Sequence, residues 1–271
     1  MLNLRDIPRL NENQHLKFSL EDASPLGIVA VNGNLSPGVL LSAYRQGIFP
    51  WYDDESPILW WSPDPRFILT PEELHIPRSL RKQLRKDGFS LTVDQAFPDV
   101  IRECARVPRR EQDGTWIVPE MQQAYNRLHN LGFAHSVEVW QDEELVGGLY
   151  GVSLGKAFFG ESMFSLMSNA SKTAFVLFML ALQEKGFGLM DCQVYTEHLS
   201  QFGAYEVPRQ EFLVLLREML NAPTKHGSWS SWIDLEQIKA GMTTGGGVQF
   251  PAYSSPTHGG VEATASEPEQ K

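Results

Sequence analysis

Asp191 and Gln193 stand two positions apart in the short segment LMDCQV, residues 189–194. Side chains two apart on a strand point to the same face, so this carboxylate could hydrogen-bond to the amide and orient it. Such a pair could assist a proton transfer in which the amide contacts the reacting group. A polar strand end that bonds to neighbouring backbone is the alternative, because matches to so short a pattern are common.

Glu161 lies in the segment FFGESMFS, among Phe158, Phe159, Met163 and Phe164. A carboxylate surrounded by rings must be paired, hydrogen-bonded or shifted in pKa, and this favours a functional role. A glutamate at a strand end that points into water is the alternative interpretation.

The segment PRSLRKQLRK carries five positive charges and no acidic residue. On a helix these residues fall along one side, where they could neutralise phosphates; they are Arg78, Arg81, Lys82, Arg85 and Lys86. A solvated helix face is the alternative. The local patch stands out because the whole chain has a net charge of −10, which disfavours indiscriminate binding to nucleic acid.

Other kinds of site find little support in the sequence. No GxSxG, Walker or GxGxxG motif is present, and the histidines have no obvious triad partner, so covalent catalysis has no clear nucleophile. The only cysteines, Cys104 and Cys192, form no CxxC pair, which argues against a structural zinc site and suggests a reducing compartment such as the cytoplasm. The longest apolar run, residues 174–182, is too short to span a bilayer.

The elements that would position these residues follow from periodicity and turn signals. A helix is predicted after Ser36, and the ring-rich loop GIFPWYDDESPILWWSPDPR, residues 47–66, follows it. Beyond a boundary near residue 62 we expect strands at 67–70, 89–93 and 189–194, an antiparallel meander over 134–164, and helices at 77–86, 95–105, 119–130, 172–185 and 208–220.

The expected organisation is therefore a small N-terminal domain with the aromatic loop, residues 1–62, and a larger domain, residues 63–224. The remainder, residues 225–271, has the Gly, Ser, Thr and Pro content of a disordered tail. The fold class predicted from these elements is α+β.

A series of motifs resembles the leucyl/phenylalanyl-tRNA-protein transferase family. In chain order they are AYRQGIFPWY, PILWWSPDPR, LHIPRSLRK, GTWI, AYNRLHNLGFAHSVEVW, LVGGLYGV, FFGESMFS, NASKTA and DCQVYTEHLSQFGA, covering about residues 25–218. The resemblance implies that the larger domain is acetyltransferase-like (GNAT-related), with a mainly antiparallel sheet flanked by helices. It implies no coenzyme A, cofactor or metal.

The same resemblance implies an activity: transfer of Leu or Phe from aminoacyl-tRNA to the N-terminal Arg or Lys of an acceptor protein, which marks that protein for N-end rule degradation. It assigns catalysis to Asp191, Gln193 and Glu161. The apolar pocket for the Leu or Phe side chain would consist of Leu149, Phe158, Met163, Phe175, Phe178 and Met190, with Trp51 and Trp116 near the aminoacyl-adenosine. A flexible pocket of this kind would also accept Met and would disfavour β-branched side chains.

The rings of the loop at 47–66 would then stack on the 3′ adenosine, although Trp60 or Trp61 could serve instead to join the two domains. Which carboxylate receives the proton stays open at this point, and so does a mechanism of positioning alone. Two other functions also remain: an RNA-binding module without catalysis, and an acetyltransferase, against which the missing pyrophosphate-binding loop counts.

Overall fold

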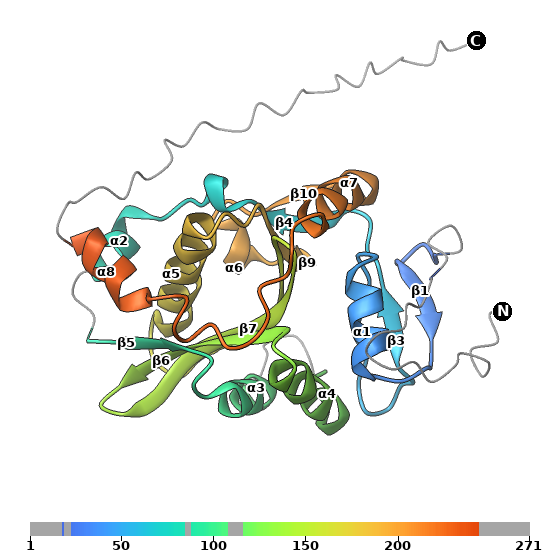
Figure 1. Cartoon of the computed structure of the whole chain (residues 1–271), viewed down its shortest axis with the longest axis horizontal. Helices are drawn as coiled ribbons and strands as arrows, with labels where there is room; N and C mark the ends of the chain where they lie inside the picture. Colours follow the sequence, from blue (N-terminus) through green and yellow to red (C-terminus); the bar gives the residue numbers. More distant parts are fainter. Residues whose placement is uncertain (1–17, 19–22, 85–87, 108–115, 244–271) are drawn as a thin grey trace, which may run out of the picture.

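The computed structural model describes residue 18 and residues 23–84, 88–107 and 116–243. It contains two sheets, one in the N-terminal part and one in the remainder of the chain (Figure 1). The predicted α+β class is confirmed, with a small N-terminal domain and a larger, mostly antiparallel sheet flanked by helices. The change from one sheet to the other falls between Trp61 and Arg66.

The N-terminal part combines one helix with three short strands in the order β1-β3-β2: β1 (Ile28–Val31), β2 (Phe49–Pro50) and β3 (Leu59–Trp61). Helix α1 (Pro37–Tyr44) begins at the predicted Ser-Pro sequence, and nearly all of it is buried. Gly47 follows with φ 73, and a Cβ here would lie 2.7 Å from the Phe212 ring, so glycine permits close packing against helix α7 (Arg209–Leu220).

The larger sheet has seven strands in the order β10-β4-β9-β8-β7-β6-β5. The predicted meander forms its centre as β6 (Ala134–Gln141), β7 (Glu144–Leu154) and β8 (Ala157–Ser165). The other strands are β4 (Arg66–Leu69), β5 (Ser90–Val93), β9 (Leu189–Gln193) and β10 (Tyr205–Val207). Strands β8 and β9 pair in parallel, whereas the other neighbouring pairs of this described sheet are antiparallel.

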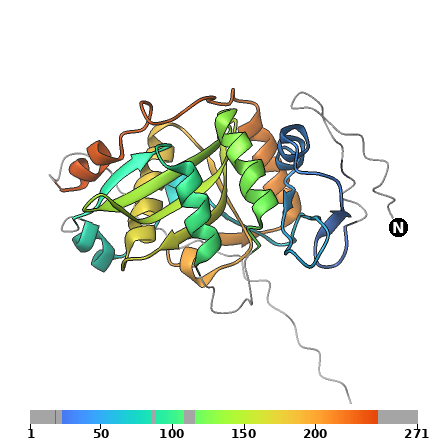
Figure 2. The same ribbon diagram turned by 90° about the horizontal axis from the view of Figure 1, so that it is seen from below.

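Helices cover both faces of this sheet. Helices α3 (Phe97–Arg106) and α4 (Pro119–Asn130) lie on one face, and α5 (Ala170–Glu184) lies on the other (Figures 1 and 2). Shorter elements complete the larger domain: α2 (Arg78–Leu84), α6 (Glu197–Ser200), α8 (Leu235–Thr243) and the 3-10 helix η2 (Pro71–Glu73). Two apolar clusters result, one on each face, and the small domain joins the cluster on the α3 and α4 side.

The C-terminal segment differs from the prediction that disorder begins at residue 225, because the chain remains folded as far as residue 243. Trp229 is fully buried, its ring stacks on His135 with centroids 3.8 Å apart, and its backbone N–H donates to Asp94 Oδ2 at 2.7 Å. Although this region is rich in Gly, Ser and Thr, its buried Trp229 ring attaches it to the larger domain. Residues 244–271, the rest of the predicted tail, lie outside the described part of the chain.

Helix α8 then covers β5, the edge strand of the sheet. Glu236 accepts a hydrogen bond from the backbone N–H of Leu91 at 2.6 Å, and Lys239 donates to the carbonyl oxygen of Phe89 at 2.5 Å. These side chains satisfy backbone groups that no further strand would reach.

Candidate active site

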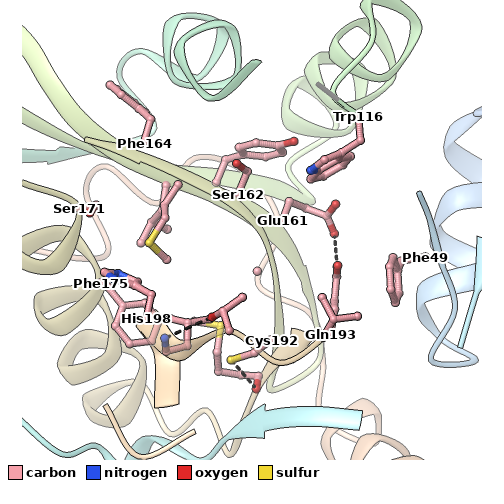
Figure 3. A pocket seen from close by; sticks show the side chains of 18 of the residues that line it. Phe49, Trp116, Glu161, Ser162, Phe164, Ser171, Phe175, Cys192, Gln193 and His198 are labelled. Carbon is pink, nitrogen blue, oxygen red and sulfur yellow. Dashed lines mark hydrogen bonds between the residues drawn. The ribbon is translucent and has the colours of Figure 1, made fainter. Parts of the chain in front are cut away.

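The candidate site lies where β8 and β9 separate. Their parallel pairing runs from Ala157 and Leu189 to Phe159 and Asp191, and each strand continues beyond its last paired residue. Glu161 and Gln193 lie two residues past that point, one on each strand. Their side chains meet there, with Gln193 Nε2 donating to Glu161 Oε1 at 2.8 Å (Figure 3).

A cavity of about 710 Å³ opens beside this pair. Its lining includes seven of the eight residues predicted to bind substrate: Trp51, Trp116, Leu149, Phe158, Met163, Phe175 and Met190. Phe178 is the exception, because its ring packs edge-on against Phe158, with centroids 4.8 Å apart, and is itself buried. It therefore supports the cavity wall from behind rather than forming it.

Aromatic side chains from the small domain close one end of the cavity. Phe49 and Trp51 line it together with Trp116, and Phe49 lies beside Gln193 in the view of Figure 3. The ring of Trp61 packs 5.3 Å from that of Trp51, and its Nε1 donates to the Trp51 carbonyl oxygen at 2.7 Å. Trp61 thus positions the loop that carries Trp51.

Trp60 does not contribute to the cavity lining. It is buried, it donates from Nε1 to the carbonyl oxygen of Asn32 at 2.8 Å, and its ring packs 5.6 Å from that of Phe18. These contacts are internal to the N-terminal part of the chain, so Trp60 stabilises the small domain itself.

Glu161 is held by hydroxyl and amide donors on both of its oxygens. Tyr44 donates to Oε1 at 2.6 Å, and Tyr125 donates to Oε2 at 2.9 Å, in addition to the bond from Gln193. The two phenol oxygens also contact each other. Burial raises the pKa of Glu161 to about 7 despite these donors, which act in the opposite direction, so the group can change protonation state near neutral pH.

The two tyrosines were not predicted from the sequence. They lie 81 residues apart, at the end of α1 and within α4, and no local spacing connects them with each other or with Glu161. Burial, together with the nearby Glu161 carboxylate, raises the pKa of both phenols well above the usual value. Both therefore remain protonated and serve as hydrogen-bond donors.

Asp191 does not orient the Gln193 amide as the spacing predicted. Its carboxylate instead binds the Arg66 guanidinium and accepts the backbone N–H of Gln193 at 3.0 Å. Asp191 is fully buried and is not among the residues that line the cavity, whereas its neighbours Met190 and Cys192 are. A positive φ of 67 at Gln193 breaks the alternation of the strand, which is why the amide faces the cavity and the carboxylate does not.

The described part of the basic helix covers Arg78–Leu84, and none of these residues lines the cavity. Arg78 and Lys82 are exposed, while Arg81 is half-buried and donates from Nε to the carbonyl oxygen of Ile76 at 3.0 Å. Arg85 and Lys86, the other two residues of the predicted patch, lie outside the described residues. The described part of the patch therefore consists of the exposed Arg78 and Lys82 and of Arg81, which also hydrogen-bonds to the backbone just before its own helix.

The described residues contain no group of three or more His, Cys, Asp or Glu side chains that could hold a metal ion. None of the described helices combines the length and apolarity needed to cross a bilayer.

Comparison with known proteins gives consistent matches along the chain. Residues 68–217 match the family model for leucyl/phenylalanyl-tRNA protein transferase, and residues 33–64 match the model for its N-terminal domain. A protein of Anaeromyxobacter sp. (strain Fw109-5), named leucyl/phenylalanyl-tRNA--protein transferase, is 58% identical over 207 residues, which cover 76% of this chain and 88% of that one. A protein of the same name from Syntrophus aciditrophicus (strain SB) is 57% identical over 216 residues, covering 80% and 89% of the two chains.

Similarity to solved structures is much weaker. L-PGS from Bacillus licheniformis aligns with 12% identity and a TM-score of 0.34 over 66% of this chain and 64% of that one. A GCN5-related N-acetyltransferase from Kribbella flavida aligns with 12% identity and a TM-score of 0.26 over 71% and 62% of the two chains. Alignments this weak carry no conclusion about activity.

Proposed function

The chain belongs to the leucyl/phenylalanyl-tRNA-protein transferase family and is an aminoacyltransferase that uses tRNA and protein substrates, and from this premise we propose its specific substrates and the roles of its residues. The donors are Leu-tRNA and Phe-tRNA, with Met-tRNA also accepted. The acceptors are proteins with N-terminal Arg or Lys, which the transfer marks for N-end rule degradation in the cytoplasm.

The observation that carries this proposal is the placement of one titratable carboxylate, Glu161, at the wall of a large apolar cavity. An aminoacyl ester is already activated, so peptide-bond formation requires orientation and removal of a proton from the attacking amine rather than a covalent nucleophile. An apolar cavity with one carboxylate at its wall meets both needs.

The donor side chain occupies the part of the cavity formed by Leu149, Phe158, Met163, Phe175 and Met190. Flexible methionine and flat phenylalanine side chains adapt to Leu, Phe and Met, whereas a branch at Cβ would meet the walls near the entrance. Trp51 and Trp116 stack on the terminal adenosine, because a ring recognises an unpaired base through its π face.

Glu161 is the proton acceptor in this scheme. The incoming α-ammonium loses a proton to the Glu161 carboxylate, and the neutral amine then attacks the ester carbonyl carbon. The new C–N bond forms, the bond from that carbon to the ribose oxygen breaks, and a second proton passes from the nitrogen to the departing oxygen. Gln193 orients the amine through its side-chain oxygen, which is left available because Nε2 is bonded to Glu161.

Asp191 takes no part as a proton acceptor in this scheme. Both of its oxygens are bound by the Arg66 guanidinium, and the carboxylate does not reach the cavity. The alternative left open by the sequence, in which Asp191 receives the proton through Gln193, lacks a hydrogen bond between those two side chains. Asp191 acts instead on the backbone of Gln193.

A label-transfer assay tests the proposal. Radiolabelled Leu-, Phe- or Met-tRNA should pass its label to a peptide that begins with Arg or Lys, and not to the same peptide beginning with Asp. Ile-tRNA should react at least about tenfold less efficiently, as expected when one misplaced methyl group meets an apolar pocket. Binding of tRNA without transfer would indicate an RNA-binding module, and transfer of label from acetyl-CoA would indicate an acetyltransferase.

A further inference from the structure

Arg66 is a charged side chain that is completely buried. It lies in β4 and binds Asp191 through two bonds, from Nε to Oδ1 at 2.8 Å and from Nη2 to Oδ2 at 2.6 Å. Two rings pack on its guanidinium, those of Phe49 at 4.8 Å and Phe212 at 4.5 Å. A buried ion pair is weak evidence for stability, because desolvation opposes the attraction, so its placement calls for another explanation.

The carboxylate that Arg66 holds makes one further contact. Asp191 Oδ1 accepts the backbone N–H of Gln193, which has the left-handed φ of 67. A residue other than glycine adopts this conformation at a cost, and surrounding contacts must maintain it. From this conformation the Gln193 side chain reaches Glu161 at 2.8 Å. A continuous series of contacts therefore runs from Arg66 through Asp191 to the backbone and then the amide of Gln193.

We infer that Arg66 is a positioning residue for aminoacyl transfer: by fixing the Asp191 carboxylate, it maintains the turn that directs the Gln193 amide toward Glu161. This inference rests on the proposed function of the Glu161 and Gln193 pair. Arg66 does not line the cavity, so it acts on the reacting groups only through other residues.

Arg66 also contacts a wall of the cavity. Phe49, whose ring packs on the guanidinium, comes from the small domain and lines the cavity, beside Gln193 in the view of Figure 3. Phe212 packs on the same guanidinium from α7 and is not part of the lining. The planar Arg66 guanidinium packs between these two rings. It therefore aligns Phe49, which the small domain contributes to the cavity wall, with the turn at Gln193 in β9.

The test is a pair of neutral substitutions, made singly and together: Arg66→Gln and Asp191→Asn. Each single variant leaves one buried charge without its partner, and the displaced turn should lower kcat for transfer from Phe-tRNA by about 10²-fold, with KM for Phe-tRNA little changed. In the double variant both charges are gone, and the asparagine oxygen can still accept the Gln193 N–H. The double variant should therefore recover kcat by about tenfold or more relative to either single variant.

A double variant no faster than Asp191→Asn would overturn the inference, because the carboxylate itself would then be needed in the reaction. A normal kcat in Arg66→Gln would overturn it as well. Absence of transfer by the unmodified protein would contradict the proposed function, which distinguishes that failure from a failure of this inference.

Loss of folding is separated from loss of positioning by two further variants. Arg66→Lys keeps the charge but can neither bind both carboxylate oxygens in a fork nor stack flat between the rings, so kcat should fall about tenfold while the protein stays folded. A normal kcat in this variant would overturn the inference even if Arg66→Gln fails to fold. Asp94→Asn weakens a buried cluster of which no member lines the cavity, and it should lower the unfolding temperature without lowering kcat. If Asp94→Asn lowers kcat as much as the Arg66 variants do, the loss of kcat in the Arg66 variants is explained by lower stability. The inference would then fail.

Discussion

At the scale of single residues, the balance of forces on Glu161 determines how the site would respond to pH. Burial raises its pKa to about 7, and the bonds from Tyr44, Tyr125 and Gln193 limit that rise. The carboxylate form, which would accept the proton, therefore predominates only above about pH 7.

We predict that kcat with a saturating Arg peptide rises through about pH 7, because protonated Glu161 cannot accept the amine proton. Glu161→Gln should lower the plateau and move the midpoint of this rise toward the pKa of the free amine, about 7.7–8.0. Single-turnover rates from pH 5.5 to 9 would measure both effects. An unchanged midpoint in the variant would mean that Glu161 is not the titrating group.

Tyr44 gives a second, independent prediction. Its hydroxyl stabilises the charged form of Glu161, so Tyr44→Phe should raise the pKa of Glu161 further and displace the rise of kcat to higher pH. Phe158→Leu serves as a control, because it alters the cavity without removing a donor to Glu161. The same displacement in both variants would indicate a general effect of packing.

The same carboxyl group links pH to stability. Its pKa is higher in the folded state than the ordinary value of 4.5, so the unfolded chain releases this proton first as pH rises. The contribution of Glu161 to the free energy of unfolding is therefore fully present below about pH 4.5 and is lost as pH rises through about 7. Urea unfolding of the unmodified protein and of Glu161→Gln should differ in pH dependence within this interval and nowhere else.

At the scale of elements, the described part of the segment after residue 225 packs against the larger domain and stabilises it. Trp229 packs near Phe158, Phe178 and Phe187, with ring centroids 6.1, 6.3 and 5.7 Å away, so it supports the residue that forms the cavity wall. Helix α8 covers the edge strand β5. The described part of this segment, up to residue 243, therefore affects the site through packing.

We predict that Trp229→Ala lowers the free energy of unfolding by about 3–5 kcal/mol, the usual loss when a large buried ring is removed from a core. Deletion of residues 244–271 should leave this free energy within about 0.5 kcal/mol of its starting value, because their composition does not favour burial. Urea titrations with a shared m value would test both. An equal loss in the free energy of unfolding in the two variants would contradict the assignment of the stabilising contacts to residues before 244.

Helix α2 carries the remaining element-scale prediction. Arg78→Ala with Lys82→Ala should flatten the salt dependence of tRNA binding by up to about 0.7–0.9 log units per lost phosphate contact. Arg127 on α4 is an exposed arginine of another face, and its replacement by Ala should leave the slope unchanged. If the slope of the double variant equals that of the unmodified protein, the charges of α2 form a solvated face only.

At the scale of the whole molecule, the sequence predicted the long elements better than the short ones. The meander and helix α4 have clear periodicity or caps, and the structure has them where they were expected. The N-terminal sheet was missed because β2 has two residues and β3 has three, too few for alternation to be visible. The folded C-terminal segment was missed because composition was averaged over a region that contains the buried Trp229.

The site could be predicted in part for a similar reason. Glu161 and Gln193 stand in motifs that resemble the family, and most of the cavity lining follows from those motifs. The contact between Arg66 and Asp191 spans 125 positions of the chain, and that between Tyr44 and Glu161 spans 117, so neither leaves a local pattern. Only the packing of the small domain against the larger sheet brings Tyr44 to Glu161 and Phe49 to the cavity.

The proposed reaction at this site joins an aminoacyl group to a protein amine, and the stoichiometry of one turnover measures it directly. Excess protein would be mixed with Phe-tRNA and an Arg peptide, and the deacylated tRNA and the extended peptide would be counted together. We predict one extended peptide, heavier by one phenylalanine residue at its N-terminus, for each tRNA deacylated. Deacylation in excess of peptide formation, or no deacylation at all, would contradict the account.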